Sequence, residues 1–532
     1  MTATPAAEQP PAPTPDRPRD PRRWLILGVI CLAQLVVILD NTILNVAVPT
    51  LTDDLGAGTA DVQWIINAYV LVQAGLLLAA GAAADRYGRK KLLLTGLVLF
   101  GAGSLAAALA HSTGQLIAAR AGMGVGGALL LTTTLAVAVQ VFDDDERVRA
   151  IGVWAAVNAL GFAAGPLVGG VLLAHFWWGS LFIVNVPVVL LGLCAVSVLV
   201  PESRVEQSHR PDLLGALLST IAMASLVYAV VSGPDHGWSS RYVLTGAGLG
   251  VCALTGFVLW ERRVQDPMLD MSFFRNRTFT GAVIGAVLIT FGSGGALFLL
   301  TQQLQFVLGY GPLEAGLRTA PFALTVVLLN FTGISARLSK RLGIPGSVAV
   351  GMTLLACGLA AVALAGRVVD GYGGLLVGLV LMGVGCAFAN PAMAVAVMGA
   401  IPREKAGAGA GIQGTVTEFG SGLGVAVLGA VLSARFSALV PVAAASLPAA
   451  LAATDSAAER RTVTRAFGSA LETGQLVGAA AVLTGGLIAA TLLRRAEHTA
   501  QPETETETEA ETEAEAEAGV KPVADAAVTD PA

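Results

Sequence analysis

The sequence predicts an all-α protein that crosses a membrane many times, and three observations lead to this fold class. The chain has 532 residues, of which 55% are hydrophobic and only 13% are charged, and its mean hydropathy is +0.71. Apolar runs of about 20 residues, each long enough to span a hydrocarbon core as a helix, recur from Trp24 to Leu493. The formal net charge of −5 arises in an acidic tail, because the chain before that tail is net positive.

Charged, proline-rich or glycine-rich breaks divide the apolar runs into fourteen predicted helices. Their approximate ranges are 24–50, 62–84, 91–111, 114–141, 149–173, 180–200, 212–232, 242–261, 278–308, 314–337, 345–366, 372–400, 407–434 and 474–494. With a cytoplasmic N-terminus, most of the 32 lysines and arginines fall on cytoplasmic segments. The positive-inside rule therefore predicts that both termini lie inside. Segment 437–461 is apolar but interrupted by prolines, and we expect an external loop with an interfacial helix; a fifteenth span is the alternative.

The two ends of the chain are predicted to be disordered cytoplasmic segments. Residues 1–22 are rich in Pro and Ala, and residues 496–532 carry glutamate at every second position from Glu503 to Glu517. The five cysteines lie in separate apolar runs, so we expect no disulfide framework. The sequence shows neither a metal-ligand spacing nor a Gly-x-x-x-x-Gly-Lys-Ser/Thr loop, so we expect no metal, no ATP and no other cofactor.

The stretch LDNTILNVAVP places Asp40 inside the first predicted helix. An ionised carboxylate at mid-bilayer depth costs on the order of 3 kcal/mol or more, so such residues usually face a protein cavity. Gln34, Asn41 and Asn45 lie on one face of the same helix, which indicates a polar side. We interpret Asp40 as a functional site. A carboxylate that a neighbouring helix satisfies in a purely structural role is the alternative.

Arg120 lies inside the predicted helix 114–141, in the stretch RAGMGVGGA. The glycines of this stretch are at membrane depth and follow no strand, so they do not indicate a dinucleotide loop. A buried arginine requires an acid, and Asp40 is the partner that we expect.

Glu418 lies inside the predicted helix 407–434. It adjoins a stripe of polar residues spaced four apart, Gln413, Thr417 and Ser421. This arrangement indicates a second protonatable site that faces the same cavity as Asp40. A polar contact between helices near the membrane edge is the alternative.

The stretch GAAADRYGRKKLLL connects the second and third predicted helices on the cytoplasmic side. Arg86 and Arg89 are the basic anchors that the positive-inside rule gives to any such turn. Gly81 and Gly88 would allow close helix approach and a tight reversal, and Asp85 can pair with an arginine or a helix N-terminus. We therefore expect a gating loop here, and a tight turn with membrane anchors is the alternative.

The stretch GFAAGPLVGG lies in the predicted helix 149–173. Glycines four residues apart form a groove without side chains, against which another helix can pack closely, and a proline inside it bends the helix. Ordinary small-residue packing between membrane helices is the alternative. The residues concerned are Gly161, Gly165, Pro166, Gly169 and Gly170.

Together these stretches resemble the major facilitator superfamily, specifically its fourteen-helix drug:proton antiporter branch of multidrug and quaternary-ammonium exporters. LDNTILNVAVP resembles the helix-one signature of that branch, GAAADRYGRK resembles the cytoplasmic loop motif, and GFAAGPLVGG resembles the helix-five antiporter motif. The stretch WIINAY is a weaker similarity. Residues expected to line the substrate cavity are Gln34, Asn41, Asn45, Trp64, Asn67, Tyr69, Gln413 and Thr417.

The chain departs from the family pattern at three places. Met123 stands where the family usually has glutamine, and the usual W-R-W before the sixth helix is WGS at 178–180. GISARLSKRLG at 333–343 resembles the loop motif, with Arg337 in place of its acid, so a gate there would be degenerate.

The resemblance implies two six-helix bundles, at 23–200 and 278–495, with two linker helices at 201–277 between them. The bundles would rock around a site near the membrane midplane, opening it alternately to each side. Asp40 would take up a proton outside and release it inside. Burial and a nearby arginine shift the pKa of a carboxyl in opposite directions, so Arg120 would tune Asp40.

We therefore expect a proton-coupled antiporter of the bacterial cytoplasmic membrane that exports drugs or other lipophilic or cationic small molecules. Its expected partners are the substrate, protons and membrane lipid, without nucleic acid, and the expected state is a monomer. Two alternatives stay open. One is a narrow-specificity metabolite exporter or an uptake symporter of the same fold. The other is a membrane enzyme or sensor, which the scattered histidines do not favour.

Overall fold

The computed structural model describes residues 21–519, except 143, 204–211, 266, 268, 366–371, 402–405, 441–446, 453 and 455. The side chains of Asn45 and Asp85, and those beyond Arg495, lie outside the description. The expected disorder of 1–22 and of the acidic tail stays a prediction, and the backbone of residues 496–519 continues the last helix. In the described part every regular element is a helix.

The first half of the chain forms a bundle whose helices share one hydrophobic core. Its helices are α1 Arg23–Leu55, α2 Thr59–Tyr87, α3 Arg89–Ala108, α4 Thr113–Val141, α5 Asp144–His175, the short α6 Ser180–Ile183 and α7 Asn185–Leu199. We call the end of the bundle at which α1 begins the terminal end, and the end at which α1 stops the distal end. The long helices alternate in direction between these ends, and α6 and α7 together form one span.

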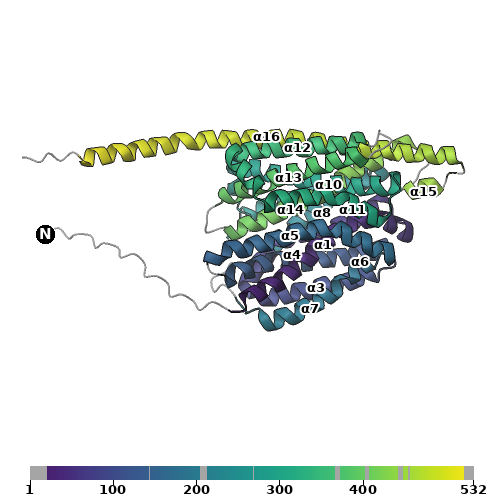
Figure 1. Ribbon diagram of the computed structural model, residues 1–532, viewed down its shortest axis with the longest axis horizontal. Helices are drawn as coiled ribbons and strands as arrows, with labels where there is room; N and C mark the ends of the chain where they lie inside the picture. Colours follow the sequence, from purple (N-terminus) through teal and green to yellow (C-terminus); the bar gives the residue numbers. More distant parts are fainter. Residues whose placement is uncertain are drawn as a thin grey trace, which may run out of the picture.

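The second half forms a matching bundle with its own core. Its helices are α10 Arg277–Gln302 with the π turn Gln303–Val307, α11 Pro312–Phe331, α12 Ile334–Ala365, α13 Tyr372–Gly399, α14 Ala406–Leu439, α15 Leu447–Ala452 and α16 Ala457–Gly519. The linker consists of α8 Leu213–His236, α9 Arg241–Glu261 and the 3₁₀ turn Met271–Arg275. Figure 1 shows the two bundles side by side with roughly parallel helices.

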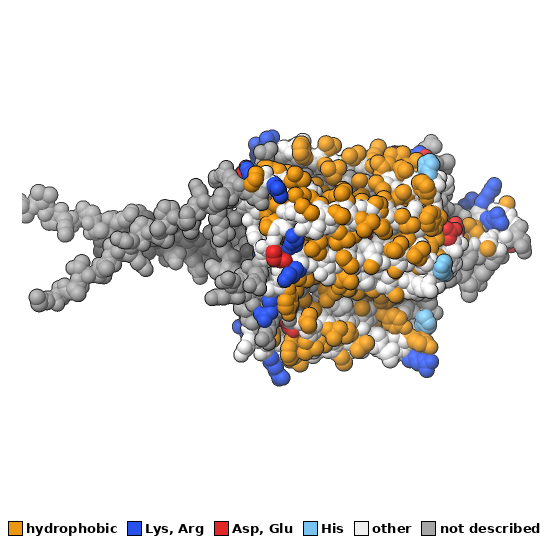
Figure 2. All heavy atoms as spheres, turned by 90° about the horizontal axis from the view of Figure 1, so that it is seen from below, with side chains coloured by type: hydrophobic (Ala, Val, Ile, Leu, Met, Phe, Trp, Pro, Cys, Tyr) orange, Lys and Arg blue, Asp and Glu red, His pale blue; other side chains and the backbone are white. Residues whose placement is uncertain are grey.

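Thirteen of the described helices are long and apolar enough to cross a membrane. The helix that completes the predicted fourteen is α5, whose described apolar segment, Ala164–His175, is shorter than a full span. Hydrophobic side chains cover the side of the helical body, and basic side chains gather at its edges (Figure 2). Exposed leucines of this kind, such as Leu244, Leu249 and Leu254 of α9, suit contact with lipid rather than water.

Apolar clusters join the bundles at the distal end and along one side. At the distal end, Val48 and Val62 of the first bundle pack in one cluster with Phe298 and Phe467 of the second. Along one side, α8 packs against both bundles. Its Val227 lies in one apolar cluster with residues of α2 and α14. The linker helices therefore lie beside the interface between the bundles.

The structure differs from the predicted helices at three places, each for a local reason. The turn expected at 338–344 lies at Gly343, which has φ +68°, because Ser335 before it and Gly351 after it contact neighbouring residues of α13, Ala387 and Ala389. The difference is an additional break at Gly333, with φ +69°, inside the predicted helix 314–337. The last helix begins at Ala457 rather than 474, because Ser456 and Glu459 cap each other's backbone N–H at 3.1 and 3.3 Å. The helix predicted at 180–200 is broken at Val184, three residues before a proline.

Candidate functional site

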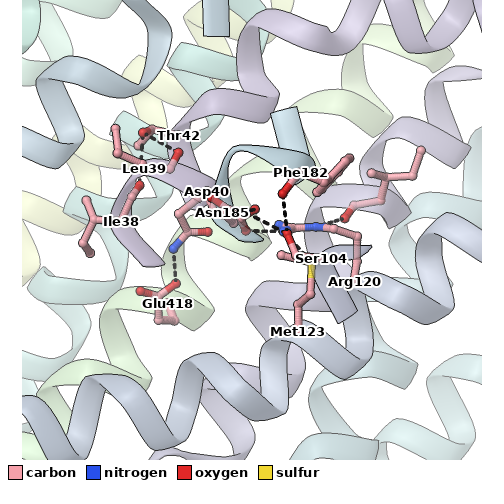
Figure 3. A network of polar contacts seen from close by, with 12 residues as sticks. Ile38, Leu39, Asp40, Thr42, Ser104, Arg120, Met123, Phe182, Asn185 and Glu418 are labelled. Carbon is pink, nitrogen blue, oxygen red and sulfur yellow. Dashed lines mark hydrogen bonds and ion pairs between the residues drawn. The ribbon is translucent and has the colours of Figure 1, made fainter. Parts of the chain in front are cut away.

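A buried ion pair between Asp40 and Arg120 forms the centre of the site (Figure 3). Asp40 of α1 is 1% exposed and Arg120 of α4 is 0% exposed, and Arg120 Nη1 donates to Asp40 Oδ2. Arg120 Nε donates to the carbonyl of Ile65 at 3.2 Å, and its guanidinium carbon lies 4.2 Å from the ring centroid of Tyr69. The structure therefore brings the acid and the expected arginine together. Such a pair persists without water because each charge is neutralised and hydrogen-bonded.

The second carboxylate oxygen of Asp40 faces the joint between α6 and α7. Asn185, the first residue of α7, donates from Nδ2 to Asp40 Oδ1 at 3.2 Å and to Ser104 Oγ at 2.9 Å. Ser104 of α3 in turn donates to the carbonyl of Phe182 at 2.9 Å. All four side chains are buried. Asn185 and Ser104 were not among the site residues predicted from the sequence, although an asparagine directly before Val-Pro in an apolar run was a usable signal.

Asn41, next to Asp40, crosses to the other bundle. Its Nδ2 donates to Glu418 Oε2 of α14 at 3.3 Å, and Glu418 is half-buried. Figure 3 shows Glu418 on the opposite side of α1 from the ion pair. Gln413 and Thr417 are half-buried on the same helix as Glu418, where Thr417 Oγ1 donates to the carbonyl of Gln413 at 2.8 Å. Consecutive residues of α1 thus contact an arginine of one bundle and an acid of the other.

The predicted polar face of α1 divides into separate contacts. Gln34 is 0% exposed and lies inside the first bundle, where its Nε2 donates to Asn158 Oδ1 at 2.8 Å and its Oε1 accepts from Thr134 Oγ1 at 2.9 Å. Trp154 of α5 donates from Nε1 to the same threonine at 3.4 Å. Gln34 therefore ties α1 to α4 and α5, whereas Asn41 points to the second bundle.

The expected cavity residues of α2 lie in three different environments. Trp64 is half-buried against Tyr228 of α8, with ring centroids 6.2 Å apart. Asn67 is 0% exposed at the interface with α14, and no described residue gives either of its amide atoms a hydrogen bond. A Cβ placed on Gly422 would lie 2.7 Å from Asn67 Oδ1. Tyr69 is buried under Arg120.

The glycine-rich stretch of α5 packs against α1. Gly161, Gly165 and Gly169 are all buried. A Cβ on Gly165 would lie 2.8 Å from Thr42 Cβ, and one on Gly169 would lie 2.7 Å from Ile43 Cγ1. The predicted groove therefore holds the helix that carries Asp40.

The same stretch also contacts the second bundle. A Cβ on Gly170 would lie 2.7 Å from Leu313 Cα of α11. In return, a Cβ on Gly316 would lie 2.9 Å from the carbonyl carbon of Pro166. Helix α5 thus lies between α1 and α11, in contact with both at backbone distance.

The loop between α2 and α3 is anchored within the first bundle. Gly88 has φ +110°, which a residue with a side chain rarely adopts, and the turn reverses the chain there. Arg89 Nη1 donates to Gln140 Oε1 of α4 at 3.2 Å. The backbone N–H of Lys90 donates to Glu202 Oε1, beyond the end of α7, at 3.2 Å. These contacts hold the terminal ends of α3, α4 and α7 together.

Other expectations for this loop had different outcomes. A Cβ on Gly81 would have no atom within 4 Å, so close helix approach is not its role in this conformation. Arg86 is half-buried, and the pairing expected of Asp85 lies outside the described side chains. Arg337, in the first turn of α12, is exposed.

The sequence-family model of the Major Facilitator Superfamily matches residues 30–425 of this chain. The chain is similar to the methyl viologen resistance protein SmvA of Salmonella typhimurium, with 38% identity over 79% of this chain and 84% of that protein. It is also similar to the multidrug resistance protein Stp of Mycobacterium tuberculosis, at 37% over 76% and 75%, and to the multidrug efflux pump LfrA of Mycolicibacterium smegmatis, at 34% over 82% and 86%.

Solved structures with the same fold are more distant in sequence. A bacterial homologue of the human lysosomal transporter Spinster, in an inward-facing and unoccupied conformation, aligns with a TM-score of 0.61 and 18% identity over 90% of this chain and 98% of that chain. A POT peptide transporter in complex with sulfate aligns with a TM-score of 0.61 and 16% identity over 88% and 94%. At this identity the likeness concerns the fold.

Proposed function

Because the chain belongs to the Major Facilitator Superfamily, we propose that it is a proton-coupled antiporter that exports drugs or other lipophilic or cationic small molecules by alternating access. The relatives named for drug resistance and efflux support export, and the multi-pass helical fold supports a place in the bacterial plasma membrane. Both termini are proposed to be cytoplasmic, as the positive-inside rule favours.

The observation that carries this proposal is that Asp40 and Asn41 contact different bundles. Asp40 is paired with Arg120 inside the first bundle, and Asn41 is hydrogen-bonded at 3.3 Å to Glu418 of the second. Proton binding to Asp40 removes one charge of the ion pair and so weakens the attraction that holds α1 against α4. A shift of α1 then moves Asn41 relative to Glu418. The protonation state of Asp40 and the arrangement of the bundles are therefore coupled.

Glu418 is proposed to receive the cationic substrate. It is half-buried, it lies at the interface of the bundles, and it accepts a hydrogen bond from the neutral amide of Asn41. A cationic drug near Glu418 would replace that hydrogen bond with a charge-assisted contact. Substrate binding would thereby release the bond between the bundles.

Alternating access is proposed to open the distal end, where contacts close the interface in this structure. Gln305 Nε2 donates to the carbonyl of Val46 at 2.9 Å, and the apolar cluster of Val48, Val62, Phe298 and Phe467 surrounds the same region. These contacts would separate when the site opens to the outside.

The first experiment is a drug-susceptibility panel in a bacterial host that lacks its own efflux pumps, with methyl viologen and ethidium as organic cations. We expect the protein to raise resistance to several cations. In everted vesicles an imposed pH gradient, acid inside, should drive their accumulation. Movement of substrate out of the vesicles together with protons would indicate an uptake symporter. Protection against a single compound would indicate a narrow exporter. Absence of any flux from reconstituted protein would overturn transport itself.

A further inference from the structure

Asp40 has no free oxygen in this structure. Oδ2 is held by Arg120, and Oδ1 accepts from Asn185 Nδ2 at 3.2 Å. A proton that binds one of these oxygens occupies a lone pair and removes the negative charge, so it weakens the hydrogen bond which that oxygen accepts. The Asn185 contact is the weaker of the two, because it is a longer contact with a neutral group. The proton should bind at Oδ1.

A protonated carboxyl in a buried site needs an acceptor, because it gains an O–H donor. The guanidinium of Arg120 has no acceptor to offer. Asn185 and Ser104 are the side chains that hydrogen-bond in a chain from Oδ1, and both types can donate or accept. The same two residues can therefore satisfy Asp40 in both of its charge states, which no apolar side chain can do.

We propose that Asn185 is a positioning residue for proton binding, which turns its amide between the two charge states of Asp40. The inference rests on the proposed proton coupling through Asp40. A proton from water forms a bond to Oδ1, and Asn185 rotates its amide so that Nδ2 leaves and the amide oxygen accepts the new O–H. Proton release reverses the rotation, and the proton returns to water.

The turn of the amide also reverses Ser104. In this structure Ser104 accepts from Asn185 Nδ2 at 2.9 Å and donates to the carbonyl of Phe182 at 2.9 Å. When the amide oxygen faces Ser104, the hydroxyl donates to it and leaves the Phe182 carbonyl. Phe182 lies in α6 and Asn185 begins α7. The protonation state of Asp40 thus changes the hydrogen bonds at the break between these two helices.

Other charged or titratable groups around Asp40 are few in the described structure. Arg120 of α4 pairs with it, Tyr69 of α2 lies with its ring centroid 4.2 Å from the guanidinium carbon, and Glu418 of α14 is reached through Asn41. The elements that carry Ser104 and Asn185 present only neutral groups to Asp40. A change at Asn185 therefore alters a dipole and leaves the charges around Asp40 intact.

The test is infrared difference spectroscopy of the full-length protein in lipid bilayers during a pH titration. The C=O stretch of protonated Asp40 is identified as the band that Asp40→Asn removes. In Asn185→Leu, this band should move to higher wavenumber, because its O–H has lost an acceptor. Its midpoint should move toward higher pH by about one unit, because the ionised carboxylate loses more than the neutral acid when a donor is deleted.

Asn185→Ser is the conservative control, and it should restore the band position and most of the midpoint, since a hydroxyl can also donate and accept. Ser104→Ala should give a smaller shift in the same direction, and it provides a second route if Asn185→Leu does not fold. A band and midpoint in both Asn185→Leu and Ser104→Ala that match the wild type would overturn the role of Asn185. If Asp40→Asn removes no band at any pH, the proposed proton coupling itself fails, which is a separate outcome.

Discussion

Replacing Arg120 by leucine should leave the Asp40 carboxylate buried with a single neutral donor. Asp40 is 1% exposed and would keep only the 3.2 Å hydrogen bond from Asn185. Breaking one partner of a buried pair costs about 3–5 kcal/mol. At roughly 2–4 °C per kcal/mol for a bundle of this size, the melting temperature should fall by about 6–20 °C. This loss of stability comes from the uncompensated charge of Asp40. A cavity contributes little, because leucine fills much of the space of the arginine stem.

The assay is thermal unfolding of the purified protein in detergent, at acidic and alkaline pH. The loss in Arg120→Leu should be largest at alkaline pH, where the lone carboxylate is ionised, and smaller at acidic pH, where it takes up a proton. The double variant Arg120→Leu, Asp40→Asn should recover most of the melting temperature, because the asparagine is neutral and keeps a contact to Asn185. A double variant as unstable as Arg120→Leu alone would refute the reasoning.

Three further predictions concern the surroundings of the pair. Glu418→Gln should weaken resistance to organic cations at least tenfold while leaving neutral drugs less affected, measured as inhibitory concentrations; equal loss for both classes contradicts a role in cation recognition. Gly165→Val should abolish transport and lower the melting temperature by clashing with Thr42, whereas the control Gly28→Ala, which meets no atom within 4 Å, should behave as wild type. Gly88→Ala should destabilise the protein by about 1–2 kcal/mol, because alanine is strained at φ +110°; unchanged thermal unfolding would show that the turn adapts.

The fold followed from patterns that are local in the sequence. Apolar runs give helix number and approximate bounds, and thirteen spanning helices with the shorter segment of α5 lie close to the fourteen expected. The errors came from short signals within polar or glycine-rich joints. Gly333 and Gly343 both have positive φ, but the chain reverses only at Gly343, and the sequence does not distinguish that turn from the break at Gly333.

The sequence predicted those site residues whose burial carries a high free-energy cost. Asp40 and Arg120 stand out because a charge inside an apolar run needs a partner, and only one acid and one arginine lie at suitable depth in the first bundle. Asn185 and Ser104 did not stand out, because neutral polar groups cost less and occur throughout membrane helices. Their role depends on α3 and α7 meeting α1, which no spacing in the sequence encodes. For the same reason the sequence did not predict that Asn41 is the hydrogen-bond partner of Glu418.

The most direct test of proton coupling through Asp40 is gradient-driven drug accumulation in everted vesicles that contain wild type or Asp40→Asn. Drug binding without a gradient and drug exchange at equal concentrations are measured on the same vesicles. The account predicts that Asp40→Asn keeps binding and exchange but loses accumulation driven by the pH gradient. Wild-type accumulation by Asp40→Asn under that gradient would contradict it.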